Sequence, residues 1–243
     1  MSDPLDRARS FESVAAEYER WRPDYPEAAL RWAVERLGLA PGARVLDVGA
    51  GTGKLTRGLV ALGFEAVAVE PGGPMLEQLR LAVPEAEAHQ AQAEAIPLPD
   101  ESVDATFAGQ AYHWFDRSRA LPELHRALRP GGGFALLWNW WDERDPLQRE
   151  LGELIGYAGH GPYVEEELPG EPWFAEVART VIETEGESTA DALVGYLATA
   201  SGFLVASAAE REEGLQAVRD LAARYGDPFP FPRLTYVFAF RRL

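Results

Sequence analysis

The sequence predicts an α/β fold built on a doubly wound sheet of seven strands. The first observation is that short apolar segments alternate with segments of helical periodicity from residue 44 to residue 138. The second is a glycine-rich turn between the first strand and the next helix, and the third is a pair of strand-length segments near the end of the chain. Strands that alternate with helices form a mainly parallel sheet with helices on both faces.

The composition describes a globular, acidic chain without cysteine. Its 243 residues fit one large domain, and 47% of them are hydrophobic. The 23 basic and 39 acidic residues give a net charge of −16, which repels phosphate backbones, so we expect no nucleic-acid partner. The absence of cysteine excludes disulfides, a thiol nucleophile and cysteine-bound zinc.

The chain shows no segment typical of export or of a membrane span. The first residues, Met1 to Pro4, contain no apolar signal region. Residues 193–209 carry no charge, but they are fewer than the ~20 apolar residues that cross a bilayer. We therefore expect a cytoplasmic protein without a membrane partner. The sequence does not indicate an oligomeric state.

Two amphipathic helices precede the first strand. Four apolar residues share one face of the first helix: Phe11, Val14, Tyr18 and Trp21. Pro23 ends this helix, because the residue before a proline disfavours helical backbone. The second helix is expected over residues 26–37, with Gly38 at its end.

The next feature is a strand at 44–48 that runs directly into a glycine-rich turn. Glycines stand at alternate positions: Gly49, Gly51 and Gly53. Glycine allows a tight turn and lets a ligand approach the main chain. Apolar residues then recur at helical spacing up to Leu62, so the free N–H groups of a helix start point at the same place.

Three kinds of glycine loop compete for this turn, and the spacing separates them. A phosphate-binding P-loop needs glycine at position 48 and Ser or Thr at position 55, but the residues are Val48 and Leu55. A dinucleotide loop needs its third glycine at position 54, where the chain has Lys54. The remaining pattern is Asp47-x-Gly49-x-Gly51-x-Gly53.

The second strand, at 64–69, ends in an acidic residue. Glu70 follows Gly53 by 17 residues, at the tip of this strand. A carboxylate at this position accepts both hydroxyls of a ribose, and dinucleotide-binding folds use the same arrangement. Glu70 therefore indicates a nucleoside without distinguishing one cofactor from another.

The loop pattern, together with Glu70, closely resembles the first motif of the class I S-adenosylmethionine-dependent methyltransferases. The resemblance implies S-adenosylmethionine as cofactor and a Rossmann-like sheet whose last strand is antiparallel. It implies an N-terminal helical lid at 1–40, a cofactor-binding core at 41–138, and an insertion with the C-terminal part of the same domain at 139–243. It also implies that Tyr18 contacts the cofactor from the lid. We expect Asp47 to anchor the loop by accepting its backbone N–H groups.

Two later loops extend the resemblance. The loop after a short third strand, Gln92 to Asp100, is similar to the family segment that contacts adenine through an acid and a backbone N–H; here Gln92 replaces the acid and Ala93 supplies the N–H. Gln110, after the fourth strand at 103–108, is a further expected cofactor contact. The next residues, Tyr112-His113-Trp114, resemble a segment of the branch that includes trans-aconitate methyltransferases. These three aromatic side chains are expected to face the substrate.

The rest of the chain completes the sheet. A helix with Leu121, Leu124 and Leu128 on one face leads to a fifth strand at 133–138, and an insertion at 139–172 follows. A sixth strand is expected at 178–185 and the last at 234–240. Between them, a capping box at Ser188 opens a helix that runs to Ala200, and another helix covers 211–225.

These features predict a methyltransferase that acts on a small molecule. The methyl acceptor is an oxygen, nitrogen or carbon nucleophile, with a carboxylate among the candidates, and no metal is expected. His113 is the candidate catalytic base, since imidazole exchanges protons near neutral pH. Two alternatives stay open at this point: a nicotinamide-dependent oxidoreductase and a non-catalytic cofactor-binding module.

Overall fold

The computed structural model describes residues 11–156, 161 and 168–243. The chain forms two compact units. The helical unit comprises Met1–Pro23, Trp140–Pro162 and Glu183–Leu234, and the sheet unit comprises Asp24–Asn139, Tyr163–Ile182 and Thr235–Leu243. The helix after Pro26 packs on the sheet, and the domain boundaries expected at 40/41 and 138/139 stay predictions. The lid assignment stays a prediction.

A seven-stranded sheet confirms the expected fold class. Its strands are β1 (Arg44–Val48), β2 (Glu65–Val69), β3 (Glu87–His89), β4 (Val103–Gly109), β5 (Leu128–Trp141), β6 (Phe174–Thr184) and β9 (Arg233–Arg242). Their order is β3-β2-β1-β4-β5-β9-β6, with β1 parallel to both β2 and β4, and the last strand, β9, antiparallel. The strand order reverses between β1 and β4, which is where ligands bind in open α/β sheets.

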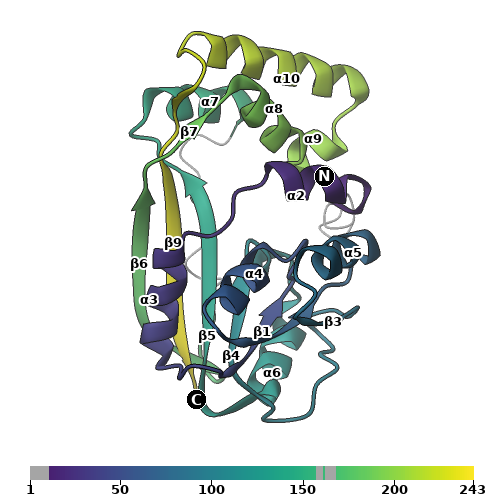
Figure 1. The fold of residues 1–243 in the computed structure, drawn as a ribbon, viewed down its shortest axis with the longest axis vertical. Coiled ribbons are helices and arrows are strands. Elements are labelled where there is room, and N and C mark those ends of the chain that lie inside the picture. Colours follow the sequence, from purple (N-terminus) through teal and green to yellow (C-terminus); the bar gives the residue numbers. More distant parts are fainter. Residues whose placement is uncertain (1–10, 157–160, 162–167) are drawn as a thin grey trace. The chain divides into compact units, whose positions relative to one another are not determined.

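Helices cover both faces of the sheet in the sheet unit (Figure 1). They are α3 (Glu27–Leu37), α4 (Lys54–Ala61), α5 (Gly73–Ala82) and α6 (Arg117–Ala127). Val45 on β1 packs with Leu30 of α3 and Leu59 of α4, whereas the adjacent Leu46 packs with Leu124 of α6 on the other face. Successive residues of a strand point to opposite faces of the sheet. Because helices cover both faces, β1 is buried on both sides, and its sequence is mostly apolar.

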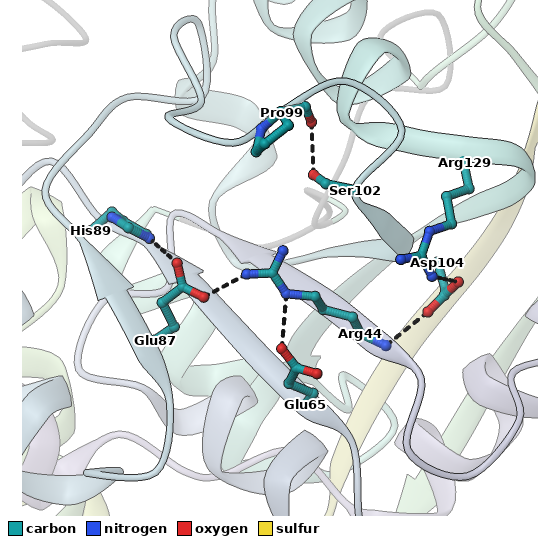
Figure 2. A network of polar contacts seen from close by, with 8 residues as sticks. All are labelled: Arg44, Glu65, Glu87, His89, Pro99, Ser102, Asp104 and Arg129. Carbon is teal, nitrogen blue, oxygen red and sulfur yellow. Dashed lines mark hydrogen bonds and ion pairs between the residues drawn. The ribbon is translucent and has the colours of Figure 1, made fainter.

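A network of charged side chains joins the beginnings of the strands, at the end of the sheet away from the glycine loop (Figure 2). The Arg44 guanidinium bonds to Glu65 and Glu87 at the starts of β2 and β3, and the Arg44 N–H donates to Asp104 of β4 at 2.8 Å. Arg129 pairs with the same Asp104. Such pairs at a solvated surface stabilise little, so we assign this network to strand register.

The helical unit has its own apolar core. Its elements are the 3₁₀ turn η1 (Phe11–Val14), α2 (Ala15–Trp21), α7 (Pro146–Ile155), α8 (Ala190–Ala198), α9 (Ser201–Val205), α10 (Ala208–Ala223), and the short strands β7 (Glu187–Ser188) and β8 (Phe229–Pro230). Leu151 of α7, Leu197 of α8 and Val218 of α10 are buried together. Gly195 lets α2 approach α8, because a Cβ there would lie 2.5 Å from the Trp21 ring.

Two helices of this unit begin differently from what the sequence predicted. The capping box predicted at Ser188 is wrong, because Ser188 pairs with Phe229 in β7, and the Thr189 hydroxyl caps α8 by accepting from the Ala192 N–H at 3.1 Å. A capping box does form between Ser207 and Glu210, where it starts α10 earlier than the predicted residue 211.

The expected insertion at 139–172 contains helix α7, which the sequence reading did not predict. Residues 157–160 and 162–167 of this insertion lie outside the described part of the chain. Within the described ranges, no helix is long and apolar enough to cross a membrane.

Candidate functional site

The loops after β1, β2 and β4 form the candidate site in the sheet unit. All three glycines of the first loop have positive φ angles: +69° at Gly49, +58° at Gly51 and +88° at Gly53. The N–H groups of Gly49 and Ala50 both donate to the Val69 carbonyl, at 2.8 and 3.1 Å, which ties the loop to the end of β2. The predicted strand–turn–helix arrangement is therefore present, and it requires glycine backbone geometry.

The loop after β4 packs directly against this turn. A Cβ on Gly49 would lie 2.6 Å from the Ala111 Cβ and 3.4 Å from the Phe115 ring. On the other side of the loop, a Cβ on Gly53 would lie 2.9 Å from the side chain of Leu79 in α5. Gly49 and Gly53 thus have two independent reasons to be glycine, the backbone angle and the lack of space.

Glu70 connects the tip of β2 to the glycine loop. One carboxylate oxygen accepts the Gly51 N–H at 2.8 Å and the other accepts the Gly72 N–H at 2.9 Å. The side chain is almost buried, with the residue 8% exposed. These two hydrogen bonds fix the carboxylate in position beside the glycine loop.

Asp47 lies fully buried below the loop, and its role differs from the expected one. Its Oδ2 accepts from the Thr56 hydroxyl of α4 at 2.6 Å, and Oδ1 receives no hydrogen bond from the described residues. The expectation that Asp47 accepts N–H groups of the glycine loop is therefore wrong, because those groups face Val69 and Glu70. Burial raises the pKa of Asp47 to about 7, against the opposing effect of the Thr56 bond, and the nearby Glu70 raises it further.

The Asp47→Asn variant should lose a pH dependence of stability. The folded-state pKa lies above the unfolded value, so the folded protein holds the extra proton and loses stability as the pH rises from about 4 to 7. Between pH 5 and 8 we expect wild type to lose about 2–3 kcal/mol of unfolding free energy relative to the variant. Urea unfolding of both proteins at four pH values measures this difference. A difference that stays constant with pH would contradict the buried titration.

The loop expected to contact adenine is held by a charged pair on α6. Arg126 donates to the Ile96 carbonyl at 2.9 Å, and Glu123 accepts the Ile96 N–H at 3.0 Å. Hydrogen bonds from Arg126 also hold the pKa of Glu123 below its ordinary value. Within this loop the Gln92 side chain is exposed, whereas Ala93 is buried. Helix α6 thus fixes the backbone of this loop, while the Gln92 side chain is exposed to solvent.

Gln110 has a backbone conformation that is rare for its residue type. Its φ is +56°, in the left-handed region that disfavours residues with a Cβ. Its N–H donates to the Leu137 carbonyl at 3.0 Å, and its side-chain amide donates to the Asn139 carbonyl at 2.7 Å. Strain that is held by surrounding bonds at the end of a sheet strand marks a candidate site position.

The aromatic segment after Gln110 divides into a buried and an accessible part. Tyr112 is 3% exposed, and its ring packs against Phe134 and Trp138 in the core. The residues form a 3₁₀ turn, η2 (Tyr112–Trp114), in which Tyr112 belongs to a buried core cluster, and its expected place facing a substrate stays a prediction. His113 is exposed, and its ring centroid lies 4.6 Å from that of the half-buried Trp114.

The structure adds polar residues that the sequence reading missed. The Lys54 side chain is only 10% exposed, and its ammonium lies 3.4 Å from Asp24, which also pairs with Arg57. Asn139, at 8% exposure, donates to the Asp24 carbonyl and accepts from the Thr235 hydroxyl at 2.7 Å. A signal was available for Lys54, since it directly follows the glycine loop. No sequence signal indicated Asn139, because its partners Asp24 and Thr235 lie 115 and 96 residues away along the chain.

Tyr25 and Tyr18 lie in different units. Tyr25, in the sheet unit, places its hydroxyl against Gly109 at the end of β4, where a Cβ would lie 2.4 Å away. Tyr18 is in the helical unit, where its ring meets Phe11 edge-on with centroids 5.8 Å apart. The expected contact of Tyr18 with the cofactor stays a prediction.

The fold and the site define a class of α/β proteins that bind a nucleoside-containing cofactor where parallel strands end. Residues 46–136 match the family model of the methyltransferase domain. An uncharacterized methyltransferase of Mycobacterium tuberculosis (strain H37Rv) is 45% identical over 220 residues, which cover 90% of this chain and 88% of the relative.

A solved structure described as a type II methyltransferase from Anaeromyxobacter dehalogenans is 30% identical, with a TM-score of 0.67. The match covers 90% of this chain and 97% of that one. An uncharacterized methyltransferase of Schizosaccharomyces pombe is 37% identical over 155 residues, which cover 63% of this chain and 62% of the relative. The chain belongs to the class I S-adenosylmethionine-dependent methyltransferases, and S-adenosylmethionine is its cofactor.

Proposed function

We propose that the protein transfers the methyl group of S-adenosylmethionine to a small-molecule acceptor with an oxygen, nitrogen or carbon nucleophile. A carboxylate is among the candidate acceptors. The observation that carries the proposal is Glu70, an almost buried carboxylate fixed by the Gly51 and Gly72 N–H groups beside the glycine loop. A carboxylate fixed at the tip of the second strand suits the two hydroxyls of a ribose.

The residues around Glu70 fit this cofactor. We assign the backbone of the glycine loop to the methionine part, Glu70 to the ribose, and Gln92 with the Ala93 N–H to the adenine. Gln110 is assigned a further contact and the Tyr18 contact stays a prediction, while Asp47 supports the first turn of helix α4 through Thr56. Bound S-adenosylmethionine supplies a sulfonium-activated methyl group, so the chain's own task is to orient the reactants and exclude water.

The acceptor atom is open. A relative from Methylococcus capsulatus, 44% identical over 102 residues, is named malonyl-[acyl-carrier protein] O-methyltransferase. Another, from Hahella chejuensis, is 34% identical over 145 residues and is named a ubiquinone/menaquinone biosynthesis C-methyltransferase. These names include oxygen and carbon acceptors, so the shared cofactor region does not define the acceptor. Placement in the branch with trans-aconitate methyltransferases and the cytoplasmic location stay predictions.

The test is methyl transfer from S-adenosylmethionine labelled in its methyl group. Carboxylic acids, alcohols, amines and carbon nucleophiles are offered as separate panels, and the label is followed into the organic product. We expect transfer in one panel and none without enzyme. Binding of S-adenosylmethionine without transfer in any panel would favour the non-catalytic module. The nicotinamide-dependent alternative has lost its basis, because Lys54 occupies its third glycine position and the family is a methyltransferase family.

His113→Gln should lower turnover if the acceptor must lose a proton. His113 is exposed beside Trp114, and a general base of this kind contributes about 10²- to 10⁴-fold. We expect kcat to fall at least ten-fold and its rise through neutral pH to disappear. His125→Gln is the matched control, because His125 bonds to the Leu243 carbonyl at 2.8 Å, outside the assigned site. An unchanged kcat and pH profile would show that positioning alone drives the reaction.

A further inference from the structure

Residues 24–26 form a short segment directly before α3, and we call this segment the strap. Its sequence is Asp24-Tyr25-Pro26, and all three residues belong to the sheet unit. Pro26 has a φ of −58°, and a proline disfavours helical backbone at the residue before it, so the strap is restricted to extended backbone. The strap contacts three parts of the candidate site: the start of α4, the end of β4 and the end of β5.

The first contact joins the strap to the glycine loop through an ion pair. The Asp24 carboxylate lies 3.4 Å from the Lys54 ammonium and also pairs with Arg57. Lys54 directly follows Gly53 and begins α4, and its side chain is only 10% exposed. A cation at the N-terminal end of a helix opposes the helix dipole, so the carboxylate of Asp24 offsets an unfavourable charge there. Asp24 thus fixes the strap where the glycine loop ends.

The second contact joins the strap to the end of β4. The Tyr25 ring packs against the apolar core cluster that contains Leu55 of α4. A Cβ on Gly109 would lie 2.4 Å from the Tyr25 hydroxyl oxygen and 3.1 Å from the Leu55 side chain. The strap and α4 therefore meet at the residue before Gln110, which has the strained φ of +56°.

The third contact passes through Asn139 on β5. The Asn139 side-chain amide donates to the Asp24 carbonyl at 3.3 Å, and its oxygen accepts from the Thr235 hydroxyl at 2.7 Å. The Asn139 carbonyl in turn accepts from the Gln110 side chain at 2.7 Å. Asp24 and Gln110 are therefore bonded to the same nearly buried residue, and the position of one affects the position of the other.

We propose that Asp24 is a positioning residue for S-adenosylmethionine. Its ion pairs with Lys54 and Arg57 hold the strap across the ends of β4 and β5, and the strap holds Gln110 in its strained conformation. The inference rests on the cofactor contacts assigned under the proposed function and is independent of the methyl acceptor. The Asp24 side chain is 58% exposed, and exposed ion pairs stabilise a fold little, so the effect should fall on cofactor affinity more than on stability.

Asp24→Asn tests this role, because it removes the charge and keeps the size of the side chain. We expect the calorimetric Kd for S-adenosylmethionine to rise at least five-fold, while the urea midpoint stays that of wild type. Asp24→Glu restores the carboxylate and should recover part of the affinity. Glu27→Gln is the matched control, since it removes an equally exposed negative charge three residues away, in an ion pair with Arg31.

Hydrogen exchange of the protein without cofactor gives a second readout. The peptide that contains Gly109 and Gln110 should exchange faster in Asp24→Asn than in wild type, and Glu27→Gln should exchange as wild type does. Arg57→Met should act in the same direction as Asp24→Asn. The double variant should add little to either single one, because both remove the same interaction.

Glu70→Ala, measured in parallel, separates a failure of this inference from a failure of the assigned site. Wild-type affinity and exchange in Asp24→Asn would overturn the positioning role, whatever Glu70→Ala shows. An equal loss of affinity in Glu27→Gln would overturn it too, since the effect would then be one of overall charge. A lowered urea midpoint that accounts for the lost affinity would mean a structural role. Wild-type affinity in Glu70→Ala would instead refute the ribose assignment.

Discussion

Replacement of Glu70 by alanine is expected to weaken S-adenosylmethionine binding by about 1–3 kcal/mol, or about 5- to 150-fold. The variant removes the acceptor of two ribose hydroxyls, and it also releases the Gly51 and Gly72 N–H groups that Glu70 holds at 2.8 and 2.9 Å. Calorimetry with S-adenosylmethionine, S-adenosylhomocysteine and NADH measures the effect. We expect the first two to bind wild type and NADH not to bind.

Two further variants make this test specific. Glu70→Gln keeps one acceptor oxygen and the side-chain length, so its affinity should lie between those of wild type and Glu70→Ala. Glu65→Ala is the matched control, because Glu65 begins the same strand and pairs with Arg44 at the opposite end. A folded Glu70→Ala protein with the affinity of wild type would refute the ribose assignment.

Gly49→Ala is expected to lower the free energy of unfolding by about 2–4 kcal/mol and to abolish measurable cofactor binding. The added methyl group meets two obstacles, a φ of +69° and the Ala111 Cβ at 2.6 Å. Relief of the contact must displace the loop after β4, which carries Gln110 and His113. Urea unfolding and calorimetry measure the two effects separately.

Gly38→Ala is the matched control for this variant. Gly38 has a similar φ of +65°, and a Cβ there would meet no atom within 4 Å. It should therefore show only the backbone cost of the left-handed conformation, about 1–2 kcal/mol, and normal cofactor binding. Equal destabilisation by the two substitutions would mean that the packing of the two loops adds nothing.

Local sequence determined the scaffold of the site. The strand at 44–48, the glycine turn and the next helix depend on residues within a few positions of one another, so their spacing is readable directly. Glu70 was predictable for the same reason, because the position after a buried strand defines where its carboxylate lies. These short-range features, with the alternation of strands and helices, were sufficient for the doubly wound sheet.

Only the tertiary structure decided which side chains meet across the chain. The hydrogen bond of Asp47 to Thr56 and the packing of Tyr112 against core rings were not predicted, because burial and the facing elements determine these partners. Ser188 does not cap a helix, because it pairs in an antiparallel ladder with Phe229, 41 residues further along the chain. The spacing of residues along the sequence predicts local backbone geometry. The burial of a charged group and the identity of its partner depend on the folded structure.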